Sequence, residues 1–324
     1  MKKLILFCLL LGSLSANLTG RSDNTVRLVL MPDTQTYARA FPHVFYSQTE
    51  WISKNADNID FVLHQGDITD GNSSKEWKVA RKAMSQLDEK IPYSIVLGNH
   101  DKSPDFNKFF PYKKYSKKPG FGGAFEEGKM DNIWQTFNAG GHKWLVFSLE
   151  FLPQSKVLKW ANEVAKQHPN HKIIVNTHAY MFSDNTRLKT GHPGIPKNLE
   201  KQTGDKARNN GEMMWKKFVS LHQDMMFVFS GHIIYNGGAG RLTSRGIHGN
   251  EVYQMLANYQ SGTKGSKPDD GWLRIIDIDF TKKEIDVKTY SPRLDKYRTE
   301  KTQQFKLKIN NTEKKTEATS GAVS

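Results

Sequence analysis

The sequence predicts an α/β fold in which β-strands alternate with α-helices. Two patterns favour it: short apolar segments alternate with longer segments of helical period, and polar residues directly follow five of the apolar segments. Of the 324 residues, 37% are hydrophobic, which is enough for a core. No apolar run reaches the roughly 18 residues that a membrane-spanning helix requires, so we expect no membrane span.

The apolar segments define the predicted strands. Each is short, apolar and bounded by turn-forming or polar residues, as is typical of buried strands, and the last third of the chain is rich in them. The predicted strands are residues 26–31, 61–64, 93–97, 143–147, 172–176, 225–229, 251–257, 272–280, 284–290 and 304–309.

Four segments between these strands are predicted to be helical, namely residues 48–56, 74–87, 154–167 and 211–222. The second places Trp77, Ala80 and Met84 on one face, with Ser73 or Ser74 as its N-cap. Residues 102–141 and 182–210 lack clear periodicity and are predicted to be irregular excursions. We find no internal repeat or linker, so we expect one domain over residues 25–309, followed by a disordered polar tail at 310–324.

The first 16 residues have the layout of a secretory signal peptide. Lys2 and Lys3 form a positive start, residues 4–11 form a short apolar stretch, and small residues at 13–16 offer a cleavage site. The mature protein is therefore expected to be secreted or periplasmic. Cys8 is the only cysteine, so removal of the leader leaves no thiol for a disulfide or for cysteine catalysis.

The chain is strongly basic. Its 47 Lys and Arg against 33 Asp and Glu give a formal net charge of +14, and a positive field attracts anions. Nucleic acids, phosphorylated metabolites and anionic envelope polymers all fit this charge. No known nucleic-acid recognition module is present, so nucleic acid is not the favoured partner.

Five predicted strands end in polar residues that suit a metal site. Ligands of open α/β sheets bind beyond the carboxyl ends of the strands, so these residues are expected to meet at one rim. Carboxylate, amide and imidazole groups together form a hard-to-borderline site, suited to Zn, Mn or Fe. The residues are Asp33, Asp67, Asn99, His100, Asp101, His178 and His232.

These residues fall in motifs that resemble those of the calcineurin-like metallophosphoesterases. The family pattern is D-x-H, G-D-x-x-D, G-N-H-D, a later H and G-H-x-H, each after a strand. The matching segments are residues 33–35, 66–70 and 98–101, then His178, then residues 231–234. The resemblance covers about residues 27–290. It implies a four-layer α-β-β-α sandwich with two divalent metal ions (Mn, Fe, Zn or Mg).

The resemblance also implies a role for each matched residue. Asp67 would bridge the two ions. Asn99, His178 and His232 would complete one of them, and Asp33 would hold the other. His100 would protonate the leaving oxygen, oriented by Asp101, and Asp70 would support the site from outside the ligand set. Two cations about 3.5–4 Å apart can clamp both oxygens of an in-line displacement at phosphorus, with a metal-bound hydroxide as nucleophile.

Two positions depart from the family pattern, and both belong to the ion held by Asp33. Gln35 replaces the histidine of D-x-H and is a weaker ligand, and Ile234 replaces the second histidine of G-H-x-H and cannot bind a metal. Three interpretations remain open. His248 is a candidate substitute ligand; or the site is weak and holds Mn or Mg with water; or only one ion is bound. We rank a weakened but working two-metal site first.

The resemblance implies a metal-dependent hydrolase of phosphoric esters, either a phosphomonoesterase or a phosphodiesterase. Its expected partner is a small anionic phosphoester. The alternatives are a nuclease or cyclic-nucleotide phosphodiesterase on the same site, and a catalytically impaired, metal-containing binding protein. The sequence assigns neither the substrate-binding residues nor the oligomeric state.

Overall fold

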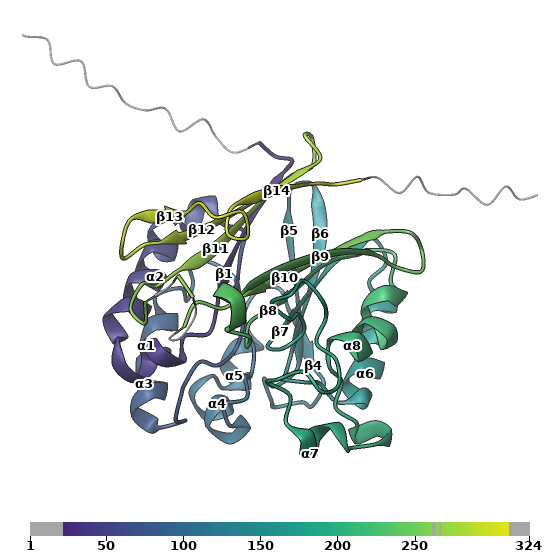
Figure 1. The fold of residues 1–324 in the computed structure, drawn as a ribbon, viewed down its shortest axis with the longest axis horizontal. Helices are drawn as coiled ribbons and strands as arrows, with labels where there is room; N and C mark the ends of the chain where they lie inside the picture. Colours follow the sequence, from purple (N-terminus) through teal and green to yellow (C-terminus); the bar gives the residue numbers. More distant parts are fainter. Residues whose placement is uncertain (1–21, 261–263, 266, 311–324) are drawn as a thin grey trace, which may run out of the picture.

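Two seven-stranded mixed sheets pack face to face, and helices cover both outer faces (Figure 1). The computed structural model describes residues 22–260, 264–265 and 267–310. Its layers are helix, sheet, sheet and helix, which confirms the predicted four-layer α/β sandwich. The predicted signal peptide and residues 311–324 of the predicted tail lie outside the described residues. None of the described helices is long and apolar enough to cross a membrane.

The first sheet has a parallel centre and an antiparallel side. The parallel strands are β1 (Thr25–Met31), β2 (Phe61–His64) and β3 (Tyr93–Ile95). β11 (Leu273–Asp279) pairs antiparallel with β1, and β12 (Glu284–Ser291) pairs with β11. β13 (Lys296–Arg298) and β14 (Phe305–Lys308) both pair with β12.

The second sheet has four parallel strands at its centre: β6 (His142–Leu149), β7 (His171–Thr177), β8 (Met225–Ser230) and β10 (Glu251–Ala257). β4 (Phe121–Ala124) and β5 (Ile133–Ala139) extend one edge antiparallel, and β9 (Ala239–Arg245) forms the other edge in a hairpin with β10.

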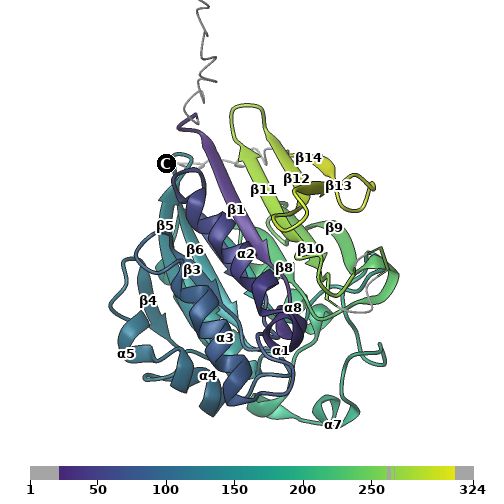
Figure 2. The same cartoon turned by 90° about the vertical axis from the view of Figure 1, so that its left-hand side faces the viewer.

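Helices α1 (Gln35–Ala40), α2 (Pro42–Lys54), α3 (Ser74–Ser85), α4 (Ser103–Phe109) and α5 (Tyr112–Tyr115) lie on the side of the first sheet. Figure 2 shows α2 and α3 lying across β1 and β3, on the outer face of the first sheet. The second sheet is covered by α6 (Ser155–Gln167) and α8 (Gly211–Lys217), with α7 (Lys197–Glu200) in the loop before α8. Short 3-10 turns occupy Ala56–Asn58, Gly204–Lys206, Val219–Leu221 and Tyr235–Gly237.

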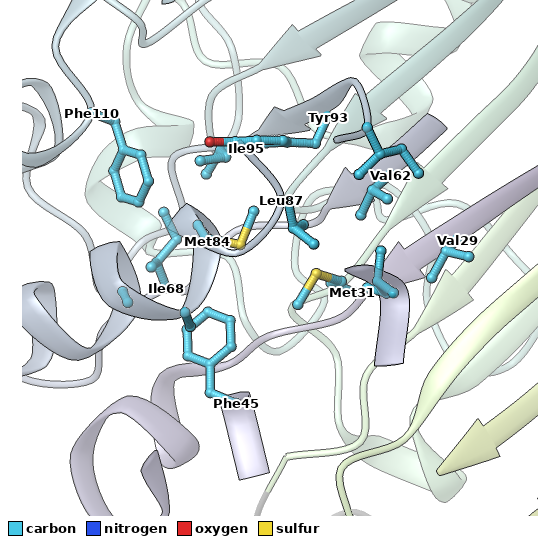
Figure 3. Close-up of a cluster of buried hydrophobic side chains, with 14 of the residues drawn as sticks. Val29, Met31, Phe45, Val62, Ile68, Met84, Leu87, Tyr93, Ile95 and Phe110 are labelled. Atoms are coloured by element: carbon cyan, nitrogen blue, oxygen red, sulfur yellow. The ribbon is translucent and has the colours of Figure 1, made fainter. Parts of the chain in front are cut away.

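Both faces of β1 are buried, which explains its unbroken apolar run. Val29 and Met31 point toward the helices and pack with Phe45 of α2 and Met84 of α3 (Figure 3). Leu28 and Leu30 point the other way, into the layer between the two sheets. Successive residues of a strand face opposite sides, so a strand covered on both faces needs an unbroken apolar run.

Several parts of the prediction are wrong in detail. The excursion at 102–141 contains α4, α5, β4 and β5, the excursion at 182–210 contains α7, and the sequence pattern missed α1, β9 and β13. The missed strands lie at or next to the edges of the two sheets, and β4 and β9 contain glycine. Pairing with a neighbouring strand stabilises such segments more than their own propensity does, so periodicity alone does not reveal them.

The start of α3 agrees with the prediction and identifies Ser73 as the N-cap. The Ser73 hydroxyl accepts a hydrogen bond from the Glu76 main-chain N–H (3.3 Å), and the Glu76 carboxylate accepts one from the Ser73 N–H (2.9 Å). This reciprocal pair is a capping box, which satisfies two main-chain donors at the end of the helix.

Replacing Ser73 by Ala is expected to lower the free energy of unfolding by about 1 kcal/mol, because it removes the N-cap acceptor. Ser74→Ala is the matched control, since Ser74 is the first residue of the helix and is exposed. Urea denaturation of the two variants and the parent measures the difference. Equal losses in both variants would contradict the assignment of Ser73 as the cap.

Candidate functional site

The carboxyl ends of the parallel strands of both sheets meet at one rim, as expected. Asp67 follows β2, His178 follows β7 and His232 follows β8. Each of these three side chains offers a ligand atom, and these atoms all lie within 4.8 Å of one another. Residues separated by more than 100 positions in the sequence therefore form one cluster.

Asp67 stands at the centre of this cluster. Its Oδ2 lies 3.2 Å from His178 Nε2, and its Oδ1 accepts a hydrogen bond from the His100 main-chain N–H at 3.0 Å. Burial opposes ionisation of Asp67, but the positive charge of His178 prevails and lowers the pKa of this carboxyl. Gly98 packs directly on Asp67: a Cβ at Gly98 would lie 2.2 Å from the Asp67 main-chain nitrogen. Only glycine fits there.

His178 is fully buried, and both of its ring nitrogens have partners. Nδ1 donates to the main-chain oxygen of Gln65 (2.8 Å), while Nε2 faces Asp67 and lies 3.0 Å from Asn99 Oδ1. Burial alone would lower the pKa of His178. The carboxylates of Asp67 and Asp33 outweigh it and raise the pKa to about 9.

His232 lies beside His178, with the ring centroids 5.0 Å apart. Its Nε2 donates to the main-chain oxygen of Gly194 at 2.8 Å, which ties the second excursion to the site. Burial, followed by repulsion from His178, lowers the pKa of His232 to about 4. The ring of Phe151 packs against both histidines, with centroids 5.0 Å from His232 and 5.7 Å from His178.

Asp33 is buried next to this cluster but is engaged by hydrogen-bond donors. Its Oδ2 accepts from Asn258 Nδ2 (2.7 Å), Gln260 Nε2 (3.3 Å) and the His232 main-chain N–H (3.1 Å). Burial, with a smaller contribution from Asp67, raises the pKa of Asp33 to about 8. Asp33 is not a member of the close cluster formed by Asp67 and the two histidines.

Gln35 and Ile234, the two departures from the motif, line the same cavity as Asp67 and His232. Gln35 is buried on α1, and within the described part of the chain its Oε1 has no hydrogen-bond partner. Ile234 is partly exposed and offers no ligand atom.

His100 projects into the cavity but is not oriented by Asp101, which corrects one expectation. His100 Nδ1 donates to the main-chain oxygen of Asp70 at 2.7 Å. The Asp101 carboxylate points inward and accepts from the main-chain N–H groups of Ile68 (3.0 Å) and Thr69 (2.9 Å), as well as from Gly98 and the Thr69 hydroxyl. Burial, reinforced by Asp67, raises the pKa of Asp101 to about 6. Asp101 therefore positions the loops after β2 and β3.

His248 as a substitute ligand is also contradicted. It precedes β10, whereas the residues after the far end of β10, Asn258 and Gln260, contact Asp33. The length of a seven-residue strand, roughly 20 Å, separates the two ends. His248 is exposed, and its Nε2 hydrogen-bonds the main-chain oxygen of Leu221.

Four further residues belong to the site and were missed in the sequence. Gly194 holds His232, Asn258 and Gln260 hold Asp33, and Arg39 pairs with the Asp70 carboxylate. Asn258 and Gln260 follow the predicted strand at residues 251–257. The criterion used for the other site residues, a polar residue just after a predicted strand, therefore applies to them too. Nothing in the local sequence marks Gly194 or Arg39.

A buried histidine supports the loops beneath the cluster. His64 Nδ1 accepts from the Gly66 main-chain N–H (3.2 Å), so Nε2 carries the proton and donates to the Thr34 hydroxyl (3.0 Å). Burial, and then the charge of His178, lower the pKa of His64 to about 3. A neutral His64 thus joins the loops after β1 and β2.

An open cavity of about 380 Å³ gives access to the cluster. It is polar on most sides, and Tyr235 adds an exposed aromatic ring at its edge. Its lining residues are Gln35, Thr36, Arg39, Asp67, Asp70, Asn99, His100, Gly194, His232, Ile233, Ile234, Tyr235 and Gln260.

One curated relative is the uncharacterized protein YvnB of Bacillus subtilis (strain 168), 30% identical over 279 residues. The match takes in 82% of this chain but 20% of the relative, so the chain spans about a fifth of that protein's length. Among solved structures, purple acid phosphatase PPD1 from yellow lupin (Lupinus luteus) seeds is similar with a TM-score of 0.51 at 11% identity. That match covers 89% of this chain and 54% of PPD1, and it supports the fold alone.

The sequence model of one family, described as calcineurin-like phosphoesterase, matches residues 26–235, which is well over half of the chain. The matched stretch contains all the motif residues that resemble the family pattern, from Asp33 to Ile234. The chain therefore belongs to the calcineurin-like phosphoesterase family.

Proposed function

We propose that this protein is a metal-dependent hydrolase of phosphoric esters that acts at the cavity above Asp67. The observation that carries the proposal is the convergence of Asp67, His178 and His232 within 4.8 Å, in a member of a phosphoesterase family. Members of this family typically bind two metal ions. The natural ester is proposed to be small, because the cavity measures about 380 Å³, and anionic, because the chain carries a net charge of +14.

The hydrogen bonds of the two histidines fit a bound cation. A carbonyl oxygen can only accept, so His178 Nδ1 and His232 Nε2 carry protons toward the Gln65 and Gly194 carbonyls. In the neutral rings the opposite nitrogens are then free to bind a metal, as in most metal-binding histidines. His178 Nε2 also faces two oxygen acceptors, Asp67 and Asn99, so either a proton or a cation must occupy that position.

Asp67, Asn99, His178 and His232 would hold this cation. Their mixed oxygen and nitrogen atoms suit Mn, Fe, Zn or Mg. When bound, such an ion polarises the phosphoryl group and lowers the pKa of coordinated water. The family pattern implies a second ion beside Asp33 and Gln35, where the donor set is poorer.

His100 is proposed as the residue that transfers a proton to the leaving oxygen. Its Nδ1 is held by the Asp70 main-chain oxygen, so Nε2 is the nitrogen free to serve the cavity that His100 lines. The His100 main-chain N–H binds Asp67 Oδ1, which couples the position of this ring to the central carboxylate. General acid catalysis of this kind contributes about 100-fold or more.

We also propose that the protein acts outside the cytoplasm, on the basis of the leader-like segment at residues 1–16.

Hydrolysis assays with p-nitrophenyl phosphate, its bis-ester and single-stranded DNA test the proposal. We expect a rate that depends on Mn²⁺ or Zn²⁺ and disappears with EDTA. His100→Ala should lower kcat by about 100-fold or more, and His178→Ala should abolish the rate, because they remove the proton donor and a ligand. His248→Ala is the matched control and should leave the rate unchanged.

The choice of substrate separates the remaining alternatives. Preference for single-stranded DNA would favour a nuclease, and preference for the bis-ester over the monoester would favour a phosphodiesterase. Binding of Mn²⁺ with no hydrolysis of any of the three esters would contradict the proposed enzyme and leave a metal-containing binding protein.

Gly194→Ala is expected to weaken Mn²⁺ binding about tenfold or more, because removing an interaction that orients a metal ligand has effects of that size. The added Cβ would lie 2.9 Å from His232 Nε2 and push the ring away. Gly191→Ala is the matched control: Gly191 has a similar positive φ (86° against 94°), but a Cβ there meets nothing within 4 Å.

Isothermal titration calorimetry with Mn²⁺, together with thermal unfolding in EDTA, measures both variants. The backbone strain should lower the stability of each to a similar extent. Equal Mn²⁺ affinity in the two variants would show that Gly194 does not position His232.

A further inference from the structure

In the half of the site around Asp33, hydrogen-bond donors surround one carboxylate oxygen that a cation would need. The Asp33 carboxylate accepts from Asn258 Nδ2, Gln260 Nε2 and the His232 main-chain N–H. The orientation of the Asn258 amide follows from its other contact, since Asn258 Oδ1 accepts from the Gln260 main-chain N–H at 3.2 Å. Three N–H groups thus compete with a metal ion for Oδ2, while Oδ1 accepts a longer contact from the same His232 N–H at 3.3 Å.

The other positions in this half supply few ligand atoms. Ile234 has none, and Gln35 offers a single amide oxygen. The opposite half brings together one carboxylate, one amide oxygen and two imidazoles, from Asp67, Asn99, His178 and His232. Divalent ions such as Zn²⁺ and Mg²⁺ take at least four ligands, so the two halves differ sharply in what they can hold.

Arg39 provides a positive charge at the cavity, on the same helix as Gln35. It lies on α1 one turn after Gln35 and lines the same cavity as Asp67, His100 and His232. Its NH1 donates to Asp70 Oδ2, which anchors the guanidinium, while 53% of the side chain stays exposed. A guanidinium has five N–H donors, so others remain for the oxygens of a phosphoryl group.

We propose that the chain holds one divalent cation, bound by Asp67, Asn99, His178 and His232, and that Arg39 faces the phosphoryl group in place of a second cation. In this inference, the identity of the substrate rests on the proposed function. The number of ions does not depend on the proposed function. In this chain, one ion and the Arg39 guanidinium would thus take the place of the family's two ions.

The number of ions is tested by removing metal from the chain, titrating it with Mn²⁺ by calorimetry and measuring bound Mn by mass spectrometry after gel filtration. We expect one equivalent for the parent chain and for Gln35→Met, a substitution that removes an amide oxygen without a partner among the described residues. His178→Ala should lose this equivalent. Electron paramagnetic resonance should show an isolated Mn²⁺ ion without exchange coupling.

Two equivalents in the parent chain, or an exchange-coupled pair, would overturn the proposal. Retention of the ion in His178→Ala would overturn its placement. Hydrolysis is measured separately, which keeps the two proposals distinguishable. One equivalent of Mn²⁺ without hydrolysis contradicts the enzyme and retains the one-ion site. Two equivalents of Mn²⁺ with hydrolysis contradict the one-ion site and retain the enzyme.

The role of Arg39 is tested by the affinity of the Mn²⁺-loaded chain for inorganic phosphate. Arg39→Met is expected to weaken phosphate binding about tenfold, the size of a lost charged hydrogen bond, with unchanged Mn²⁺ stoichiometry. Arg39→Lys should recover part of the loss. Arg245→Met is the matched control, because Arg245 is an exposed arginine on β9 outside the cavity lining.

A second comparison separates direct contact from neutralisation of Asp70. In an Asp70→Asn background, Arg39→Met should still weaken phosphate binding about tenfold, because the guanidinium itself contacts the anion. No further effect in that background would show that Arg39 only offsets the Asp70 charge and would overturn its proposed role.

Discussion

Main-chain groups in the loops that follow the parallel strands hold the side chains of this site in place. The Gln65 carbonyl orients His178, the Gly194 carbonyl orients His232, and the His100 N–H binds Asp67. The Gln65 carbonyl directly follows β2 and is positioned by the sheet, whereas the Gly194 carbonyl is positioned by the second excursion. Functional side chains tied to such groups are therefore arranged before any ligand arrives, which is the condition for a site that acts on charge.

Burial of charge gives this arrangement its chemical character. Asp33, Asp67 and His178 are almost completely removed from water, and each isolated charge would be costly there. The chain meets this constraint in two different ways. Around Asp33 it supplies amide and main-chain N–H groups, whereas around Asp67 it supplies a protonated imidazole and oxygen acceptors that a cation can share. One half of the rim is completed by protein donors, and the other is open to a metal.

The differences between prediction and structure fall in loops and at sheet edges. Neighbouring residues of the G-N-H-D motif separate, because Asp101 turns inward to four donors while His100 turns out toward Asp70. The excursions are also more ordered than their composition predicts, and one of them supplies Gly194. A motif identifies residue types, but long-range hydrogen bonds decide which way each side chain in a loop points.

Local sequence was sufficient for the α/β class, the central strands, the rim where polar residues collect and the family, because apolar periodicity and short motifs carry that information. The folded chain was needed to show that Asn258 and Gln260 hydrogen-bond Asp33, that His248 lies at the wrong end of its strand, and that Arg39 lines the cavity. The physical reason is distance along the chain. Asn258 and Asp33 are 225 positions apart, and no local pattern encodes a hydrogen bond between them.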